Sequence, residues 1–230
     1  CKLASKVTKW TTACDKQLHR LVSYVNTTLD VRSFTWVGNR PKDMNIVLYS
    51  DADFAGCKET LRSTTGVFLT IQGTHTFAPL AAVSKKQTCV SHSTPEAELV
   101  AADHAVRAEG LPALPLWELL LGRKLQVHLK EDNEAAIKNL LSGKNPNMRH
   151  MGRTHKVDFM WLHETVSNKT VTVEYTETDV MAADIFTKSF SNSAKWESLL
   201  PLIGHLDKGT FVTMPGKRGE TPSPGMRGET

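Results

Sequence analysis

The sequence lacks any apolar run long enough to span a bilayer, and its first residues lack the charged, apolar and small-residue order of a signal peptide. We therefore expect a protein that works inside the cell and away from membranes. The four cysteines, Cys1, Cys14, Cys57 and Cys89, form no Cys-x-x-Cys pair, which argues against a zinc ribbon and against a disulfide framework. Because the chain begins with cysteine instead of methionine, we expect a piece of a longer polypeptide.

The sequence also has little excess charge of either sign, since 28 basic and 24 acidic residues leave a formal charge of +4. Such a balance fits a polyanionic partner, but it fits many unrelated proteins as well. The 230 residues, 40% of them hydrophobic, suit one domain with appendages. We expect a helical N-terminal segment at 1–30, a main domain at 31–190, a helical extension at 191–212 and a disordered low-complexity tail at 213–230.

The spacing of apolar residues predicts the order of the elements. An amphipathic helix covers residues 2–25, and the low helix propensity of Thr8, Thr11 and Thr12 allows a break near Thr11. Ser93 and Glu96 form a capping box for a helix that we expect Gly110 and Pro112 to end. The predicted strands lie at 31–37, 45–50, 66–72, 74–84, 125–129 and 170–175. Further helices are predicted at 113–121, 134–141, 149–164 and 182–188.

Acidic residues lie at the ends of predicted strands and in two predicted helices. Asp51 and Asp132 each follow a strand, while Glu98 and Asp184 lie near the start of a helix. If these carboxylates converge, they cannot all stay ionised without cations, because like charges at close range oppose ionisation. Hard divalent cations with oxygen ligands remove the conflict, and two Mg²⁺ ions about 4 Å apart could together promote cleavage of a phosphodiester.

Several sequence blocks share the order and spacing of one family of nucleases. The blocks are Tyr49–Gly56, Arg62–Gly66, Ser84–Gln87, Val90–Leu99, Asp132-Asn133 and Ala183–Lys188. Across residues 12–190 the chain resembles the ribonuclease H domain of copia-type LTR retrotransposon Pol polyproteins. A lone Asp-x-Asp would carry no such weight, whereas ordered blocks make chance similarity improbable.

The resemblance implies a ribonuclease H-like α/β fold, with a mixed five-stranded sheet and helices on both faces. It implies an endoribonuclease that cuts the RNA strand of RNA–DNA hybrids during reverse transcription, using two Mg²⁺ or Mn²⁺ ions. The implied partner is the reverse transcriptase domain of the same polyprotein, in a cytoplasmic particle or the nucleus. The implied catalytic residues and metal ligands are Asp51, Glu98, Asp132 and Asp184.

Basic and polar residues near this acidic centre are candidates for contacts with the nucleic acid. They are Arg62, Lys85, Lys86, Asn133, Arg153 and Lys156. The spacing of His150, His155 and His163 is unlike that of zinc ligands on a helix, so a surface or phosphate-contacting role is favoured for them. Asp103 is interpreted as a solvated helix residue.

The chain departs from the family pattern in three places. Residues 176–181 contain no histidine before the final helix, the basic block reads Arg153-Thr-His-Lys156 with its last pair inverted, and Ala82-Val83 replace the usual tryptophan. Two alternatives to an active ribonuclease H therefore stay open. One is a degenerate retroelement remnant that binds nucleic acid without cutting it. The other is a nuclease of integrase or resolvase type, since those enzymes share the architecture and fold alone does not fix the substrate.

Overall fold

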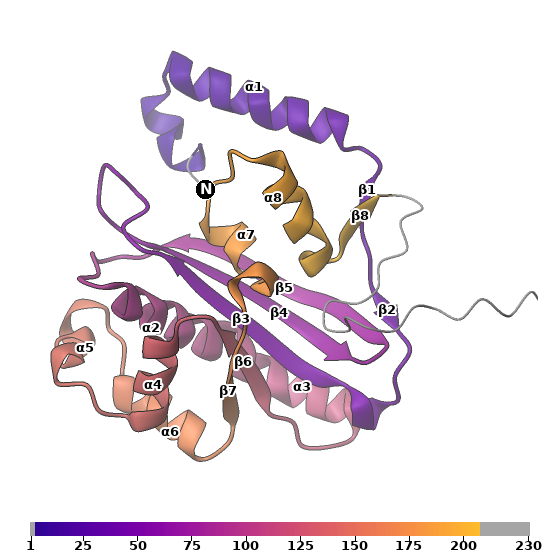
Figure 1. Cartoon of the computed structure of the whole chain (residues 1–230), viewed down its shortest axis with the longest axis vertical. Helices are drawn as coiled ribbons and strands as arrows, with labels where there is room; N and C mark the ends of the chain where they lie inside the picture. Colours follow the sequence, from indigo (N-terminus) through magenta and orange to yellow (C-terminus); the bar gives the residue numbers. More distant parts are fainter. Residues whose placement is uncertain (1–2, 208–230) are drawn as a thin grey trace, which may run out of the picture.

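The structure is a computed structural model that describes residues 3–207. The predicted tail at 213–230 and the end of the predicted extension at 191–212 therefore lie outside the described residues. A mixed sheet in the order β2-β5-β4-β3-β6-β7 forms the centre of the molecule (Figure 1). Its strands are β2 Trp36–Val37, β3 Asn45–Asp53, β4 Thr64–Gly73, β5 Thr76–Lys86, β6 Val127–Glu131 and β7 Val171–Tyr175.

The first half of the sheet is the predicted antiparallel meander, and the second half is parallel. β3 pairs antiparallel with β4 on one side and parallel with β6 on the other, and β7 continues the parallel part. The count of five strands was one too low, because the short β2 adds a sixth beside β5. The strand predicted at 31–37 is in fact divided, and its first part, β1 Val31–Ser33, pairs with β8 His205–Asp207 in a separate small sheet.

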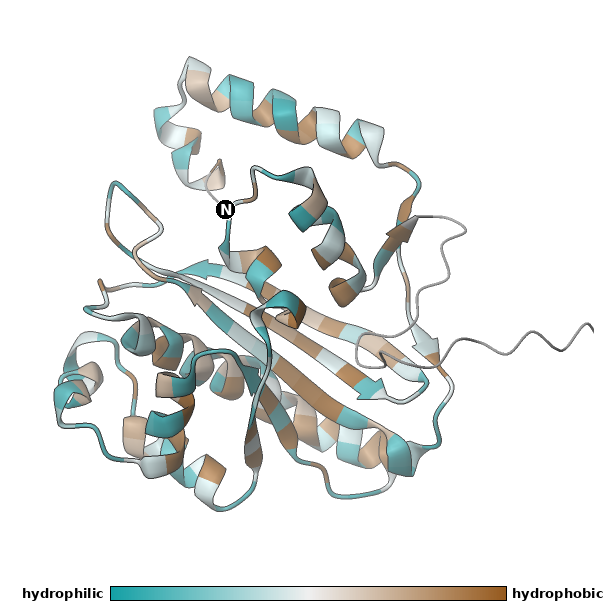
Figure 2. Ribbon diagram, in the orientation of Figure 1, coloured by the Kyte–Doolittle hydropathy of each residue, from teal (hydrophilic) through white to brown (hydrophobic). Residues whose placement is uncertain are grey.

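Helices cover both faces of the sheet, as expected (Figure 1). One layer contains α2 Thr94–Ala105, α3 Leu111–Leu121, α4 Glu134–Ser142, α5 Met151–Thr154 and α6 Phe159–Ser167. The opposite layer contains α7 Asp184–Thr187 and α8 Ser193–Leu199. The central strands are strongly hydrophobic (Figure 2), and the main core packs their side chains against the first layer. This confirms the mixed α/β fold. Among residues 3–207, no helix is long and apolar enough to cross a membrane.

Gly110 and Pro112 do not end the helix that begins after Ser93. The chain passes from α2 through a π-helical turn, Val106–Gly110, directly into α3. The wider turn accommodates the proline, which cannot donate a backbone hydrogen bond. A Cβ at Gly110 would lie 3.0 Å from a methyl of Leu48 and 3.1 Å from one of Val127, so the glycine lets this helix approach the sheet closely.

The single helix predicted at 149–164 is also wrong. The chain forms a 3₁₀ turn, Pro146–Met148, then the short α5, and only afterwards α6. Lys156 has a φ of 60°, a left-handed conformation that interrupts a helix. A new helix then starts where the Asp158 side chain accepts a hydrogen bond from the Trp161 backbone N–H at 3.1 Å.

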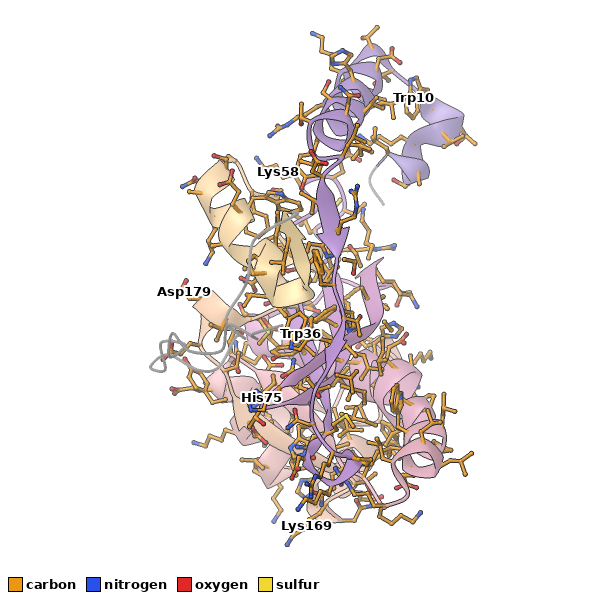
Figure 3. All side chains as sticks on the ribbon, turned by 90° about the vertical axis from the view of Figure 1, so that its right-hand side faces the viewer. Trp10, Trp36, Lys58, His75, Lys169 and Asp179 are labelled. Carbon is orange, nitrogen blue, oxygen red and sulfur yellow. The ribbon has the colours of Figure 1, made fainter. Side chains whose placement is uncertain are left out.

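The N-terminal segment lies beyond α8, away from the main sheet (Figure 1). It contains a 3₁₀ helix, Ala4–Lys9, and α1, Thr12–Thr27, so the predicted helix is divided near Thr11, where the threonines allowed a break. Cys14 is the buried residue of α1, whereas Leu21 and Val25 are more than half exposed. Trp10 projects near one extreme of the molecule, far from Lys169 at the other (Figure 3). A hydrogen bond of 2.9 Å from the Trp196 indole N–H to the Tyr24 hydroxyl joins α1 to α8.

Limited trypsin digestion should remove this segment early. The 3₁₀ helix buries no residue and α1 buries one, so little apolar contact opposes local opening. We expect the first cuts after Lys9, Lys16 and Arg20, with a resistant fragment that starts near Asp30. Mass spectrometry of the fragments checks this result, and an N-terminus that survives as long as the central sheet in a monomeric sample would contradict it.

Candidate metal centre

The site begins at the end of β3, where Asp51 lies opposite Gly66 of β4. A Cβ at Gly66 would lie 2.5 Å from a methyl of Thr187 and 2.7 Å from the Ala183 carbonyl oxygen. The glycine therefore allows α7 to lie directly on the sheet. Because Asp184 is the first residue of α7, this close approach brings its carboxylate to Asp51.

Asp51, Asp132 and Asp184 form the first group of carboxylates, with ligand oxygens all within 4.8 Å of one another. Asp51 and Asp184 are buried to 2% exposure. Lys188 Nζ lies 2.5 Å from Asp184 Oδ1 and 3.5 Å from Asp51 Oδ1. The Thr187 hydroxyl donates a hydrogen bond to Asp51 Oδ2. A residue of the chain itself thus supplies one positive charge between two of the acids.

Glu98, Glu131 and Asp132 form the second group, again with ligand oxygens within 4.8 Å of one another. Asp132 belongs to both groups and accepts a hydrogen bond from the Thr178 hydroxyl at 2.8 Å. The fully buried Glu131 accepts hydrogen bonds from the Ser50 hydroxyl at 3.1 Å and from the Asn133 backbone N–H at 3.3 Å. Glu98 Oε2, by contrast, is buried and has no hydrogen-bond partner among the described residues.

The crowding of these acids shifts their protonation. Burial, with the added charges of Glu131 and Asp51, raises the pKa of Glu98 to about 11. Burial and the charge of Asp51 raise the pKa of Asp184 to about 6. Burial also raises the pKa of Glu131 well above its ordinary value. At neutral pH the centre therefore holds protons that a divalent cation would displace.

The structure thus brings together the four predicted acids and adds three residues that the sequence reasoning missed, Glu131, Thr187 and Lys188. A signal for Glu131 was present in the sequence. Val127, Leu129 and Glu131 alternate along β6 and are all buried, which is the period of a strand face. A glutamate at the third position of that pattern points into the interior, where it needs partners.

The predicted nucleic-acid-binding residues lie on four segments of the chain. Arg62 lies in the exposed loop between β3 and β4, and Lys85 and Lys86 end β5. Lys86 Nζ donates a hydrogen bond of 3.0 Å to Cys57 Sγ in that same loop. Asn133 caps α4, its side chain accepting from the Ala136 N–H at 2.9 Å. The fourth segment includes Arg153 and Lys156, both exposed, around α5.

Three interpretations of single residues were wrong. Asp103 is not solvated, since it is buried to 2% exposure and pairs with Arg107 at 2.6 Å. His155 is not a surface residue either, because its ring is buried and its Nε2 lies 2.8 Å from Glu96 Oε1. The Ser93 cap is present, but Glu96 accepts from the His92 N–H at 3.0 Å instead of completing a capping box with Ser93.

Comparison with known proteins agrees with the resemblance in the sequence. Over 163 residues, 68% of this chain, it is 29% identical to the retrovirus-related Pol polyprotein from transposon TNT 1-94 of Nicotiana tabacum. The chain is similar to part of a retrotransposon Pol polyprotein. It spans 11% of the length of that relative. No protein-family profile matches the chain.

Two solved structures share parts of the arrangement at low sequence identity. A ribonuclease H1 isolated from compost by a metagenomic approach is 16% identical, with 67% of this chain and 98% of that chain covered and a TM-score of 0.41. The prototype foamy virus protease-reverse transcriptase is 14% identical, with 73% of this chain and 21% of that chain covered and a TM-score of 0.38.

Proposed function

We propose that this chain is a ribonuclease H that cuts the RNA strand of RNA–DNA hybrids with two divalent metal ions. The observation that supports the proposal best is the pair of carboxylate groups that share Asp132 at one edge of the sheet. The similarity to part of a retrotransposon Pol polyprotein supports the context that we propose, which is reverse transcription inside the cell beside a reverse transcriptase domain of the same polyprotein.

The residues of the centre fit Mg²⁺ or Mn²⁺. Every candidate ligand atom is a carboxylate oxygen, the donor type that hard cations prefer. The buried Glu98 Oε2 without a partner is the kind of atom that a cation would satisfy. In this proposal Asp51, Asp132 and Asp184 hold one ion, and Glu98 and Asp132 hold the other with Glu131 beside them. The ions would activate a water molecule and stabilise the leaving oxygen of the phosphodiester.

The chain's own residues prepare the site for an anionic substrate. Lys188 partly neutralises Asp51 and Asp184, which lowers the repulsion that a phosphate would meet. Thr187 orients Asp51, and Thr178 orients Asp132 from the segment that lacks a histidine. These hydroxyls fix carboxylate positions without adding charge. Because residues 176–181 contain no histidine, solvent or another group would carry out the proton transfer.

Hybrid binding should depend on phosphate contacts from the basic residues and should weaken steeply with salt. Changing both Lys85 and Lys86 to alanine removes two exposed cations from the end of β5. We expect affinity for an 18-base-pair hybrid, about one and a half helical turns, to fall about tenfold or more at 100 mM salt, with a salt slope shallower by about two. Fluorescence anisotropy measures both quantities.

The matched control is Lys42→Ala with Lys124→Ala, two exposed lysines just before the starts of β3 and β6, at the far end of the sheet from Asp51. This pair removes the same charge and should change affinity by less than about threefold, since long-range effects are screened beyond about 10 Å. Equal losses in both double variants would show that net charge, and not a surface at β5, governs binding.

A cleavage assay on matched duplexes tests the function. The chain is incubated with Mg²⁺ and with an RNA–DNA hybrid, a duplex DNA or a duplex RNA of one sequence, alone and with a reverse transcriptase domain added. We expect that, of the three duplexes, only the RNA–DNA hybrid is cut, and only in its RNA strand. Hybrid binding without cleavage in any mixture would indicate a degenerate remnant, and cleavage of duplex DNA would indicate an integrase or resolvase type of nuclease.

A further inference from the structure

Glu96 is a buried acid outside the metal centre, although it lies on the same helix as Glu98. Because each residue of an α-helix turns by about 100°, two side chains two residues apart point about 160° away from each other, to nearly opposite sides of the helix. Glu98 faces the other carboxylates, whereas Glu96 faces the chain between α4 and α6. Its side chain is only 3% exposed, so its charge is costly unless it is well hydrogen-bonded.

Three donors from two parts of the chain satisfy this carboxylate. His155 Nε2 and His150 Nε2 lie 2.8 Å and 3.0 Å from Glu96 Oε1, and the His92 backbone N–H donates to Oε2 at 3.0 Å. Burial alone would raise the pKa of Glu96, but these hydrogen bonds hold it below its ordinary value. The carboxylate therefore joins α2 to the segment that contains both histidines.

That segment, residues 146–158, is here called the basic segment. It has little regular structure of its own, since it consists of a three-residue 3₁₀ turn, the four-residue α5 and connecting residues. It carries the exposed cations Arg149, Arg153 and Lys156, and none of these has an ion-pair partner among the described residues. Lys156 also has the strained φ of 60°.

The basic segment borders a hollow of about 780 Å³. The hollow is lined by three cations, Lys144, Arg149 and Lys156, by one acid, Asp158, and by apolar side chains such as Met148 and Phe159. Unpaired cations around an open hollow suit a phosphate-bearing ligand, and their positions are set by how the segment is fastened to the rest of the domain. Apolar packing of Met148, Met151 and Val157 and a hydrogen bond of 2.7 Å from Cys89 Sγ to the Thr154 carbonyl oxygen also hold the segment. The contacts of Glu96 add a buried, charged attachment to α2 through two side chains of the segment.

We propose that Glu96 is a positioning residue that fixes the basic segment relative to the metal centre, so that one nucleic acid contacts both. This inference rests on the proposed function, because it assigns a role within the binding of the same hybrid. Glutamate suits the role because both of its oxygens accept hydrogen bonds. A glutamine would turn one of them into an NH₂ group, which cannot accept from the His92 N–H or from the histidine rings.

Glu96→Gln tests the role, with Glu197→Gln, an exposed acid of α8, as the matched control. We expect the Kd and KM for hybrid to rise about tenfold, because charge-assisted hydrogen bonds are lost, while kcat at saturating hybrid stays within about twofold. Trypsin should cut after Arg149, Arg153 and Lys156 about tenfold faster in Glu96→Gln, and at the parent rate in the control. If Glu96→Gln does not fold, His150→Gln removes one half-exposed partner and should give the same changes in smaller measure.

Three outcomes would overturn the role. Unchanged Kd and unchanged trypsin cleavage would show that Glu96 does not hold the segment. A fall in kcat with unchanged KM would instead assign Glu96 to the metal centre. If Glu96→Gln lowers the affinity for hybrid and the global stability together, and a stabilising osmolyte restores both, Glu96 would be a general structural residue. The trypsin measurement needs no substrate, so it tests the positioning role even if the chain binds no hybrid. Failure of the wild-type chain to bind any hybrid would instead contradict the proposed function.

Discussion

Asp51→Asn should lower the rate of hybrid cleavage by about three orders of magnitude, because a metal ligand that supplies about 4 kcal/mol to the transition state is lost. The fold should persist. Asparagine keeps the shape of the side chain and still accepts a hydrogen bond from the Thr187 hydroxyl. Without metal, thermal stability should hold or rise, since repulsion between Asp51 and Asp184 is relieved while Lys188 stays paired with Asp184.

The matched control for this prediction is Asp53→Asn, two residues further along β3. Asp53 belongs to neither carboxylate group, so most of the cleavage rate should remain in this variant. Initial rates with excess hybrid, together with thermal melts of both variants in EDTA, measure the two effects. A rate near that of the parent chain in Asp51→Asn would remove Asp51 from the centre and with it the proposed ligand set.

The metal-free chain should lose stability as the pH rises from 5 to 9. The folded-state pKa values of Glu98 and Asp184, about 11 and about 6, lie above the ordinary values of 4.5 and 3.8. The folded chain therefore binds more protons than the unfolded chain above pH 4.5. The stability contributed by these groups is complete below their ordinary pKa values and is lost as the pH rises toward the folded ones.

Divalent metal should restore the stability lost at high pH, because it binds the ionised carboxylates and displaces the protons. At about 100 times its Kd, Mg²⁺ contributes about 2.7 kcal/mol, which should raise the melting temperature at pH 8 by about 5–10 °C. In Glu98→Gln the side chain cannot ionise, so the melting temperature in EDTA should depend less on pH than in the parent chain. Identical melts at pH 5 and pH 9, with and without Mg²⁺, would contradict this description of the centre.

Local chemistry made much of this architecture predictable. The β-branched runs gave the strands of the meander, and Ser93 gave the start of α2. Asp51, Glu98, Asp132 and Asp184 were found because each stands in a block with a family pattern, and the structure brings them to one edge of the sheet.

The errors arose where tertiary contacts override local preference. Gly110 was taken as a helix breaker, but its lack of a side chain serves the packing of the helix on Leu48 and Val127. Lys156 has no sequence signature for a left-handed conformation, so the helix predicted at 149–164 was drawn too long. The contacts of Glu96 with His150 and His155 join residues more than 50 positions apart, and no local spacing could reveal them.

The most direct test of the central claim is the rate at which the RNA strand of a labelled hybrid is cut as a function of Mg²⁺ concentration. It is measured for the parent chain and for Asp132→Asn, because Asp132 belongs to both carboxylate groups. We predict no cleavage in EDTA, a rise with Mg²⁺ that is confined to the RNA strand, and loss of cleavage in Asp132→Asn at every concentration. Cleavage that needs no metal, or that survives in Asp132→Asn at the parent rate, would contradict a metal centre built on these carboxylates.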